Sequence, residues 1–72
     1  MDNFSERLKY LRKQKNLTQG QLAEIFKITE RGYRNYEINQ STPNFAVLLS
    51  IAEYFNVSLD YLVGWSDDPV RR

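Results

Sequence analysis

The chain contains no cysteine and no histidine, and only three glycines and two prolines among its 72 residues. Without cysteine there is neither a disulfide framework nor a thiolate that could bind a metal or act as a nucleophile. No apolar run approaches the roughly 18 residues needed to span a bilayer, and the first residues, MDNFSERLKY, lack the basic-then-apolar order of a signal peptide. These absences predict a cytoplasmic protein with no membrane span.

The same shortages argue against an enzyme. The chain has no Gly-rich phosphate loop, and its carboxylates are scattered. Glu24 and Glu30 lie six positions apart and are not expected to converge on one substrate, and no metal cluster can be assembled at ligand spacing. We therefore expect no catalytic residue, no metal, no cofactor and no small-molecule ligand.

Length and composition predict one small helical domain. A chain of 72 residues buries only about 60% of its unfolded surface, which allows a single core. Residues 1–39 hold eight Lys or Arg against five Asp or Glu, whereas residues 40–72 hold two against four. The basic half favours contact with nucleic acid, although a solvated basic helix face gives the same pattern.

Helix spacing and capping residues mark the first two helices. The first carries apolar residues at helical spacing, namely Phe4, Leu8 and Leu11. Asn3 and Glu6 resemble a capping box at its start, and Asn16 fits a left-handed stop at its end. Thr18 and Gln21 repeat the capping box and open a second, short helix. Its predicted inward face is Leu22, Ala23 and Phe26, with Ile25 beside it.

A tight turn separates the second helix from a third. The turn is predicted at Lys27 and Ile28, and Thr29 is a good N-cap for a helix over about residues 30–38. Tyr33 and Tyr36 are predicted to face inward. Two short helices joined in this way are typical of the helix-turn-helix arrangement, in which the second of the pair enters the major groove of DNA.

The C-terminal half predicts two further helices. The segment NQSTPN is a loop that begins with Asn39, and the fourth helix starts near Pro43 or Asn44. Its apolar stripe is predicted to form the centre of the core: Phe45, Leu48, Leu49, Ile51, Ala52 and Phe55. Asn56 stops this helix, and a final short helix runs from a cap at Ser58 through Val63 to a stop at Gly64. We divide the chain into a domain of residues 1–66 and a flexible C-terminal tail of residues 67–72.

Four motifs occur in order along the chain: TQ..LA, Y..YE, a proline in the next loop, and VSLDYL. The residues TQGQLAEIFKITERGYRNYE, followed by a proline and then by LL.IA..F.VSLDYLVG, resemble the phage-repressor and Cro-like family, often called the Xre family. The resemblance covers roughly residues 5–64. It implies an all-α, compact five-helix bundle of the lambda-repressor-like type. It also implies a prokaryotic or phage transcriptional regulator, favouring a repressor, that binds double-stranded DNA sequence-specifically.

The resemblance implies roles for individual residues. Base edges are read by the exposed early positions of the third helix, Thr29, Glu30, Arg31 and Arg34. Arg31 leads, because its guanidinium can donate two hydrogen bonds to guanine O6 and N7, whereas Glu30 can accept from a cytosine amino group. Phosphate is contacted by Gln19, Thr18, Lys27 and Asn35. The alternative is that the charged residues merely form a solvated helix face, where ion pairs contribute under about 1 kcal/mol.

Other positions have structural or assembly roles by the same resemblance. Arg12 and Glu37 are implied to form a partly buried ion pair; otherwise they are two unpaired surface charges. A homodimer is implied, which reads two half-sites of a near-palindromic operator about one helical turn apart. Candidates for its interface are the apolar residues Tyr54, Leu59, Tyr61 and Trp65, each of which could instead cover the domain's own core. The alternative function is a protein-interaction module, such as an antitoxin or anti-repressor partner.

Two positions depart from the family pattern. Lys27 stands where the family usually has glycine, in a turn that needs a positive φ, at a cost of about 1 to 2 kcal/mol. Gly32 lies inside the third helix, where glycine costs up to about 1 kcal/mol relative to alanine. It is expected either to let the backbone approach DNA or to accommodate Tyr33.

Overall fold

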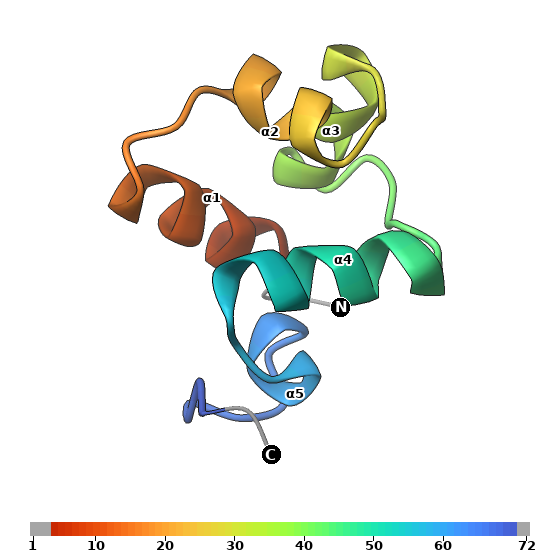
Figure 1. Ribbon diagram of the computed structural model, residues 1–72. Helices are drawn as coiled ribbons and strands as arrows, with labels where there is room; N and C mark the ends of the chain where they lie inside the picture. The colour runs from red at the N-terminus through yellow and green to blue at the C-terminus, as the bar shows by residue number, and fades with distance from the viewer. Residues whose placement is uncertain (1–3, 71–72) are drawn as a thin grey trace.

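The computed structural model describes residues 4–70, and these form five helices without a strand. They are α1 (Phe4–Gln14), α2 (Gln19–Ile25), α3 (Glu30–Glu37), α4 (Phe45–Phe55) and α5 (Leu59–Leu62). In Figure 1, α2 and α3 lie together at one end of the molecule and α5 lies at the other, with the C-terminus. The predicted all-α class with five helices is confirmed.

Side-chain caps begin the four helices from α2 onward. Thr18, Thr29, Asn44 and Ser58 each accept a hydrogen bond from the backbone N–H three residues ahead. At α2 the capping box is complete, because the Thr18 backbone N–H also donates to Gln21 Oε1 at 2.8 Å. Such caps each stabilise a helix by about 1 kcal/mol. The predicted caps are confirmed, except that Asn3 lies outside the described residues.

Left-handed residues end the chain's helical segments where the sequence predicts stops. Asn16, Asn39, Asn56 and Gly64 have φ values of 56°, 62°, 56° and 88°. Asparagine tolerates this conformation because its short polar side chain bonds locally, and glycine tolerates it because it has no Cβ. The predicted stops are therefore confirmed, and α3 itself ends at Glu37 with Ile38 as its C-cap.

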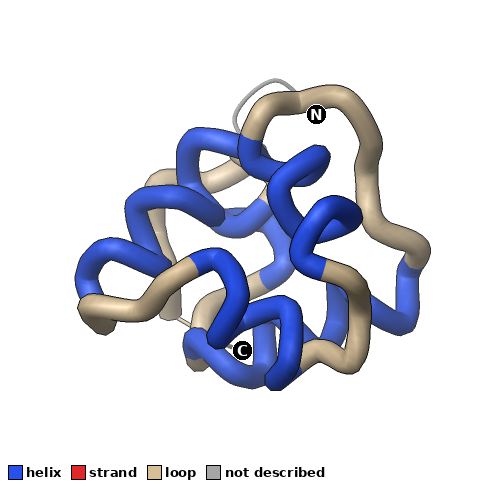
Figure 2. The backbone as a smooth tube through the Cα atoms, turned by 90° about the horizontal axis from the view of Figure 1, so that it is seen from above, coloured by secondary structure: helices blue, strands red, loops and turns tan. Residues whose placement is uncertain are grey.

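One core receives side chains from all five helices. Its buried members are Phe4, Leu8, Leu11, Leu22, Ala23, Tyr33, Ile51, Ala52, Phe55, Val57 and Leu62. Figure 2 shows the helices from above, with the connecting loops around the outside. Because Tyr33 is fully buried and Tyr36 packs against the same core, the inner face of α3 is anchored as predicted. No helix of residues 4–70 is long and apolar enough to cross a membrane.

The N-terminal end of α4 corrects one prediction. The apolar stripe predicts Phe45 in the core, but its side chain is 65% exposed. Phe45 is the first residue of α4, and helical side chains tilt toward the helix N-terminus. The ring therefore points beyond the end of the core. Pro43 is buried just before the helix, and the fully buried part of α4 begins at Ile51.

The C-terminal segment runs back along the domain. The backbone N–H of Ser58 donates to the carbonyl of Pro69 at 3.0 Å. Arg7 of α1 donates to the Ser66 carbonyl at 2.6 Å and to Asp67 Oδ1 at 2.7 Å. The tail expected from residue 67 onward thus starts with residues that contact the domain. Its last two residues, 71 and 72, lie outside the described part of the chain.

Candidate nucleic-acid interface

A buried carboxylate joins α3 to α1 and α2. Glu37 is only 4% exposed. Its Oε2 accepts from Arg12 Nε at 2.7 Å and from the Tyr33 hydroxyl at 2.5 Å, and its Oε1 accepts from Arg12 Nη2 at 3.1 Å and from Gln19 Nε2 at 3.0 Å. The structure thus contains the ion pair of Arg12 and Glu37 rather than two unpaired surface charges.

The charges of this cluster follow from its contacts. Burial opposes ionisation of Glu37, but the hydrogen bonds from Arg12, Tyr33 and Gln19 outweigh it and hold the pKa of the carboxyl below its usual value. The hydrogen bond to Glu37 raises the pKa of the Arg12 guanidinium. Burial, followed by the bond to Glu37, raises the pKa of the Tyr33 hydroxyl. At neutral pH an ionised acceptor is therefore surrounded by donors.

The turn between α2 and α3 keeps the left-handed geometry that the family pattern implies. Lys27 has φ = 58°, so the positive φ expected at this position is confirmed. The next residue, Ile28, donates its backbone N–H to the Ala23 carbonyl at 2.9 Å. Ala23 is almost fully buried between the helices. The turn therefore tolerates a lysine, with the strain that a side chain has in this conformation.

Gly32 lies beside the cap of α3. Its backbone N–H donates to Thr29 Oγ1 at 3.0 Å, and a Cβ on residue 32 would lie 3.1 Å from the same oxygen. That separation is tight, so glycine lets the cap hydroxyl sit close to the first turn of the helix. This gives Gly32 a local role that the sequence did not suggest.

The outer face of α3 carries two uncommitted arginines. Arg31 and Arg34 are exposed and lie three residues apart, so their side chains are neighbours on the helix surface, whereas Tyr33 and Glu37 of the same helix are buried. Neither side chain forms an ion pair or a hydrogen bond with any residue between 4 and 70. Their guanidinium groups are therefore available to an external acceptor.

Unlike the side chains of Arg31 and Arg34, that of Glu30 lies close to a neighbouring helix. A Cβ on Gly20 would be 3.2 Å from Glu30 Oε1 and 3.6 Å from its Cδ. The carboxylate thus lies over the first turn of α2, in the space that glycine leaves open.

The residues expected to contact phosphate lie around the two helices. Thr18 and Gln19 are at the start of α2, Lys27 is exposed in the turn, and Asn35 is half-buried on α3. The Thr18 hydroxyl oxygen accepts from Gln21 N at 3.1 Å, so its own hydrogen is free to donate outward. The bond between Gln19 and Glu37 was not predicted. It joins residues 18 positions apart, for which helical periodicity gives no signal.

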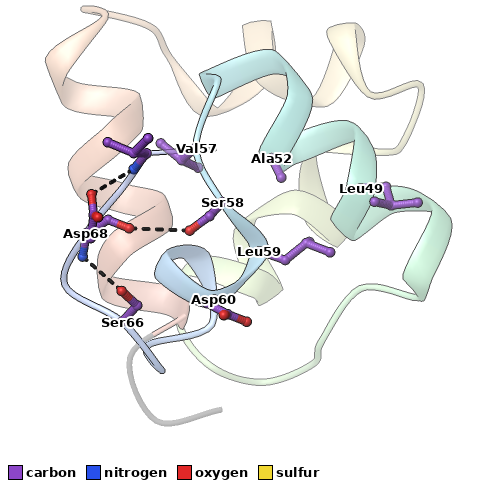
Figure 3. A pocket seen from close by; sticks show the side chains of 9 residues that line it. Leu49, Ala52, Val57, Ser58, Leu59, Asp60, Ser66 and Asp68 are labelled. Atoms are coloured by element: carbon purple, nitrogen blue, oxygen red, sulfur yellow. Dashed lines mark hydrogen bonds between the residues drawn. The ribbon is translucent and has the colours of Figure 1, made fainter. Parts of the chain in front are cut away.

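The four residues expected at a dimer interface differ in exposure. Trp65 is 85% exposed, whereas the Tyr54 ring packs edge-on against Phe26 with centroids 5.8 Å apart. Tyr61 lies beneath the Arg7 guanidinium, 4.2 Å from it. Leu59 is half-buried and, with Leu49, Ala52 and Val57, lines a groove that Ser66 and Asp68 border on the far side, as Figure 3 shows. Trp65 is thus the most accessible of the four.

Comparison with known proteins decides the family. A family model described as "Helix-turn-helix" matches residues 8–62. The chain belongs to the helix-turn-helix family. The match covers all five helices except the first turn of α1, so it confirms the lambda-repressor-like fold and the resemblance on which the site residues rest. Members of this family are DNA-binding regulators, and the expectation that the chain is not an enzyme is therefore confirmed.

Curated relatives carry the same domain. The chain is 44% identical over 68 residues to the HTH-type transcriptional regulator YqaE of Bacillus subtilis, covering 93% of this chain and 59% of the relative. It is 38% identical over 66 residues to the cryptic phage CTXphi transcriptional repressor RstR of Vibrio cholerae, covering 90% and 59%. With the HTH-type transcriptional activator BcrR of Enterococcus faecalis it shares 38% over 60 residues, covering 83% and 29%.

The helix-turn-helix domain is only part of these relatives. The chain spans about three fifths of the length of YqaE and RstR. No solved structure gives a significant match to the chain.

Proposed function

We propose that this helix-turn-helix chain is a transcriptional regulator that binds double-stranded DNA sequence-specifically, with α3 in the major groove. The observation that carries the proposal is the contrast between the two faces of α3. Tyr33 and Glu37 are buried and fully hydrogen-bonded on one side, while Arg31 and Arg34 are exposed and unpaired with any described residue on the other. A rigid helix that presents free bidentate donors is suited to reading base edges.

The dimensions of α3 are compatible with the groove. With its side chains an α-helix is about 10 to 12 Å across, and the major groove of B-DNA, about 12 Å wide, admits a helix of that diameter. In this pose Arg31 donates to guanine, and Thr29, Glu30 and Arg34 contact neighbouring base edges. Thr18, Gln19, Lys27 and Asn35 contact the phosphates on either side, which fixes the register of the helix.

We further propose that the bound protein represses transcription in the cytoplasm of its cell, on the nucleoid. RstR, a relative matched over 90% of this chain, is named as a repressor. The activator BcrR has most of its length outside the match. A DNA-binding domain that occupies an operator blocks the access of other proteins to the same DNA.

A homodimer on a near-palindromic operator completes the proposal. One recognition helix contacts only a few base pairs, and two-fold symmetry places two such helices one helical turn apart. Among the interface candidates Tyr54, Leu59, Tyr61 and Trp65, we assign the leading role to Trp65 because it is 85% exposed. Sedimentation should show a dimer whose dissociation constant rises at least tenfold in Trp65→Ser. Tyr10→Ser, which removes an exposed aromatic residue on α1, is the control and should leave the dimer unchanged.

The experiment that tests the function is selection of bound sequences from random duplex DNA, followed by titration across a salt series. Specific binding should have a slope of about −0.9 in log K against log salt for each phosphate contacted. Arg31→Ala should weaken operator binding by about 1 to 3 kcal/mol and relax the preference at one base position. The matched charge control is Lys13→Ala, which removes an exposed basic residue of α1, outside α2 and α3.

The outcomes separate the alternatives. If Arg31→Ala loses equal affinity for the operator and for random DNA, Arg31 does not read a base. A flat salt response without any specific complex would reject DNA binding and favour a module for protein contact, such as an antitoxin or anti-repressor partner.

A further inference from the structure

The side chain of Gln19 is already fixed in the free protein. Its Nε2 donates to Glu37 Oε1 at 3.0 Å, and Glu37 is 4% exposed. We propose that Glu37 is a positioning residue for DNA binding, whose carboxylate orients the Gln19 amide so that the second N–H of that amide meets a phosphate. This inference rests on the proposed function, in which Gln19 contacts the DNA backbone.

Donor and acceptor chemistry determines the orientation of the amide. An ionised carboxylate only accepts hydrogen bonds, so Gln19 has to turn its NH₂ group, and not its carbonyl, toward Glu37. A phosphate oxygen also only accepts. The same nitrogen must therefore serve both partners, one N–H for each. With the amide reversed, the carbonyl of Gln19 would face the carboxylate, and two acceptors would oppose each other.

The backbone near Gln19 is held by the same ion pair. Arg12 Nη1 donates to the Leu17 carbonyl at 3.0 Å, while Arg12 Nε donates to Glu37. The contacts at Leu17 and Gln19 lie on the two sides of the Thr18 cap. Because Arg12 belongs to α1 and Glu37 to α3, the start of α2 is fixed to both helices before DNA arrives.

Fixing a side chain in advance strengthens binding. A long, flexible side chain loses rotamer freedom when it is immobilised, and here Gln19 loses that freedom on folding instead of on association. Since phosphate contacts are not sequence-specific, loss of the Glu37 contact should weaken binding to all duplexes alike. We expect a loss of about three- to tenfold in affinity.

A double-mutant cycle tests this role through DNA affinity. The wild type, Gln19→Ala, Glu37→Gln and the double variant are titrated with the selected operator and with a random duplex, at a temperature where circular dichroism shows each to be folded. Glu37→Gln should weaken binding three- to tenfold in the wild-type background and not further in the Gln19→Ala background. Equal effects in both backgrounds would show that Glu37 acts only on the fold and would overturn the inference. Failure of the wild type to bind any duplex would overturn the proposed function and the inference with it.

Tyr33→Phe is the matched control for loss of stability. It removes the donor to Oε2 of Glu37 and leaves Oε1, the acceptor for Gln19, untouched. Its affinity for DNA should stay within twofold of the wild type. A loss as large as that of Glu37→Gln would mean that any weakening of the cluster lowers affinity, and would overturn the positioning role.

Side-chain NMR of the wild type gives a test that needs no variant. The amide NH₂ of Gln19 should have restricted motion in the free protein, whereas that of Gln40 should be mobile, because Gln40 is exposed and its side chain bonds to no described residue. On addition of operator DNA, one Gln19 N–H resonance should shift while the hydrogen bond to Glu37 persists. A Gln19 amide as mobile as that of Gln40 in the free protein would overturn the inference.

Discussion

The Tyr33 hydroxyl is expected to be one of the most stabilising polar groups of the domain. Tyr33 is fully buried, and its hydroxyl donates to Glu37 Oε2 at 2.5 Å. A hydrogen bond to a charged group contributes about 1.5 to 3 kcal/mol, and water cannot reach this site to replace the donor. Glu37 keeps its bonds from Arg12 and Gln19, so the carboxylate is not stranded. We therefore expect Tyr33→Phe to lower the free energy of unfolding by about 2 kcal/mol.

Urea unfolding at pH 7 and thermal unfolding measure this loss. For a domain of this size, about 2 kcal/mol corresponds to a melting temperature lower by roughly 8 to 16 °C. Tyr36→Phe is the matched control, because Tyr36 is half-buried on the same helix and its hydroxyl bonds to no described residue. It should change stability by less than about 0.5 kcal/mol. Similar effects of the two substitutions would refute the assignment of the stability to the bond with Glu37.

Three further outcomes are expected. The pKa of Glu37 in the folded protein lies below its unfolded value of about 4.5, so the stabilisation by this carboxylate is complete above pH 4.5 and is lost as the pH falls through the folded pKa. Urea titrations from pH 7 downward should show this loss of stability. In Glu37→Gln the loss should be smaller. Lys27→Gly should raise the free energy of unfolding by about 1 kcal/mol, because it relieves the strain of the left-handed conformation. It should also make the slope of log K against log salt for DNA binding shallower by about 0.9, because it removes a proposed phosphate contact. An unchanged slope would show that Lys27 contacts no phosphate. Arg7→Ala should speed hydrogen exchange of the Ser58 amide, whose N–H is bonded to the Pro69 carbonyl, while DNA affinity stays within twofold; unchanged exchange would show that Arg7 does not hold the C-terminal segment.

Features that depend on neighbouring residues could be predicted from the sequence. The caps at Thr18 and Thr29 and the stops at Asn16 and Asn56 are confirmed because the groups that begin or end a helix lie within about three residues of one another. The pair of Arg12 and Glu37, 25 positions apart, has no such local signal. It was implied by the family resemblance alone.

Features that depend on packing could not be predicted in the same way. The exposure of Phe45 follows from where the core ends, and apolar spacing does not contain that information. The position of the Glu30 carboxylate over Gly20 depends on how closely α2 and α3 cross. The hydrogen bonds from Gln19 to Glu37 and from Arg7 to the Ser66 carbonyl likewise join segments that only the tertiary fold brings together.

The two faces of α3 imply that stability and operator preference can change independently. Tyr33 and Glu37 on the inner face are hydrogen-bonded in a buried cluster, so a substitution at either residue alters the free energy of unfolding. Arg31 and Arg34 have no partner within residues 4–70, so replacing either leaves no stranded charge, and exposed substitutions of this kind usually change stability by less than about 0.5 kcal/mol. Variants of Arg31 should therefore select different operator sequences while their urea midpoints stay at the wild-type value. A variant that changes its operator only when it also loses stability would show that the two faces are coupled through the helix.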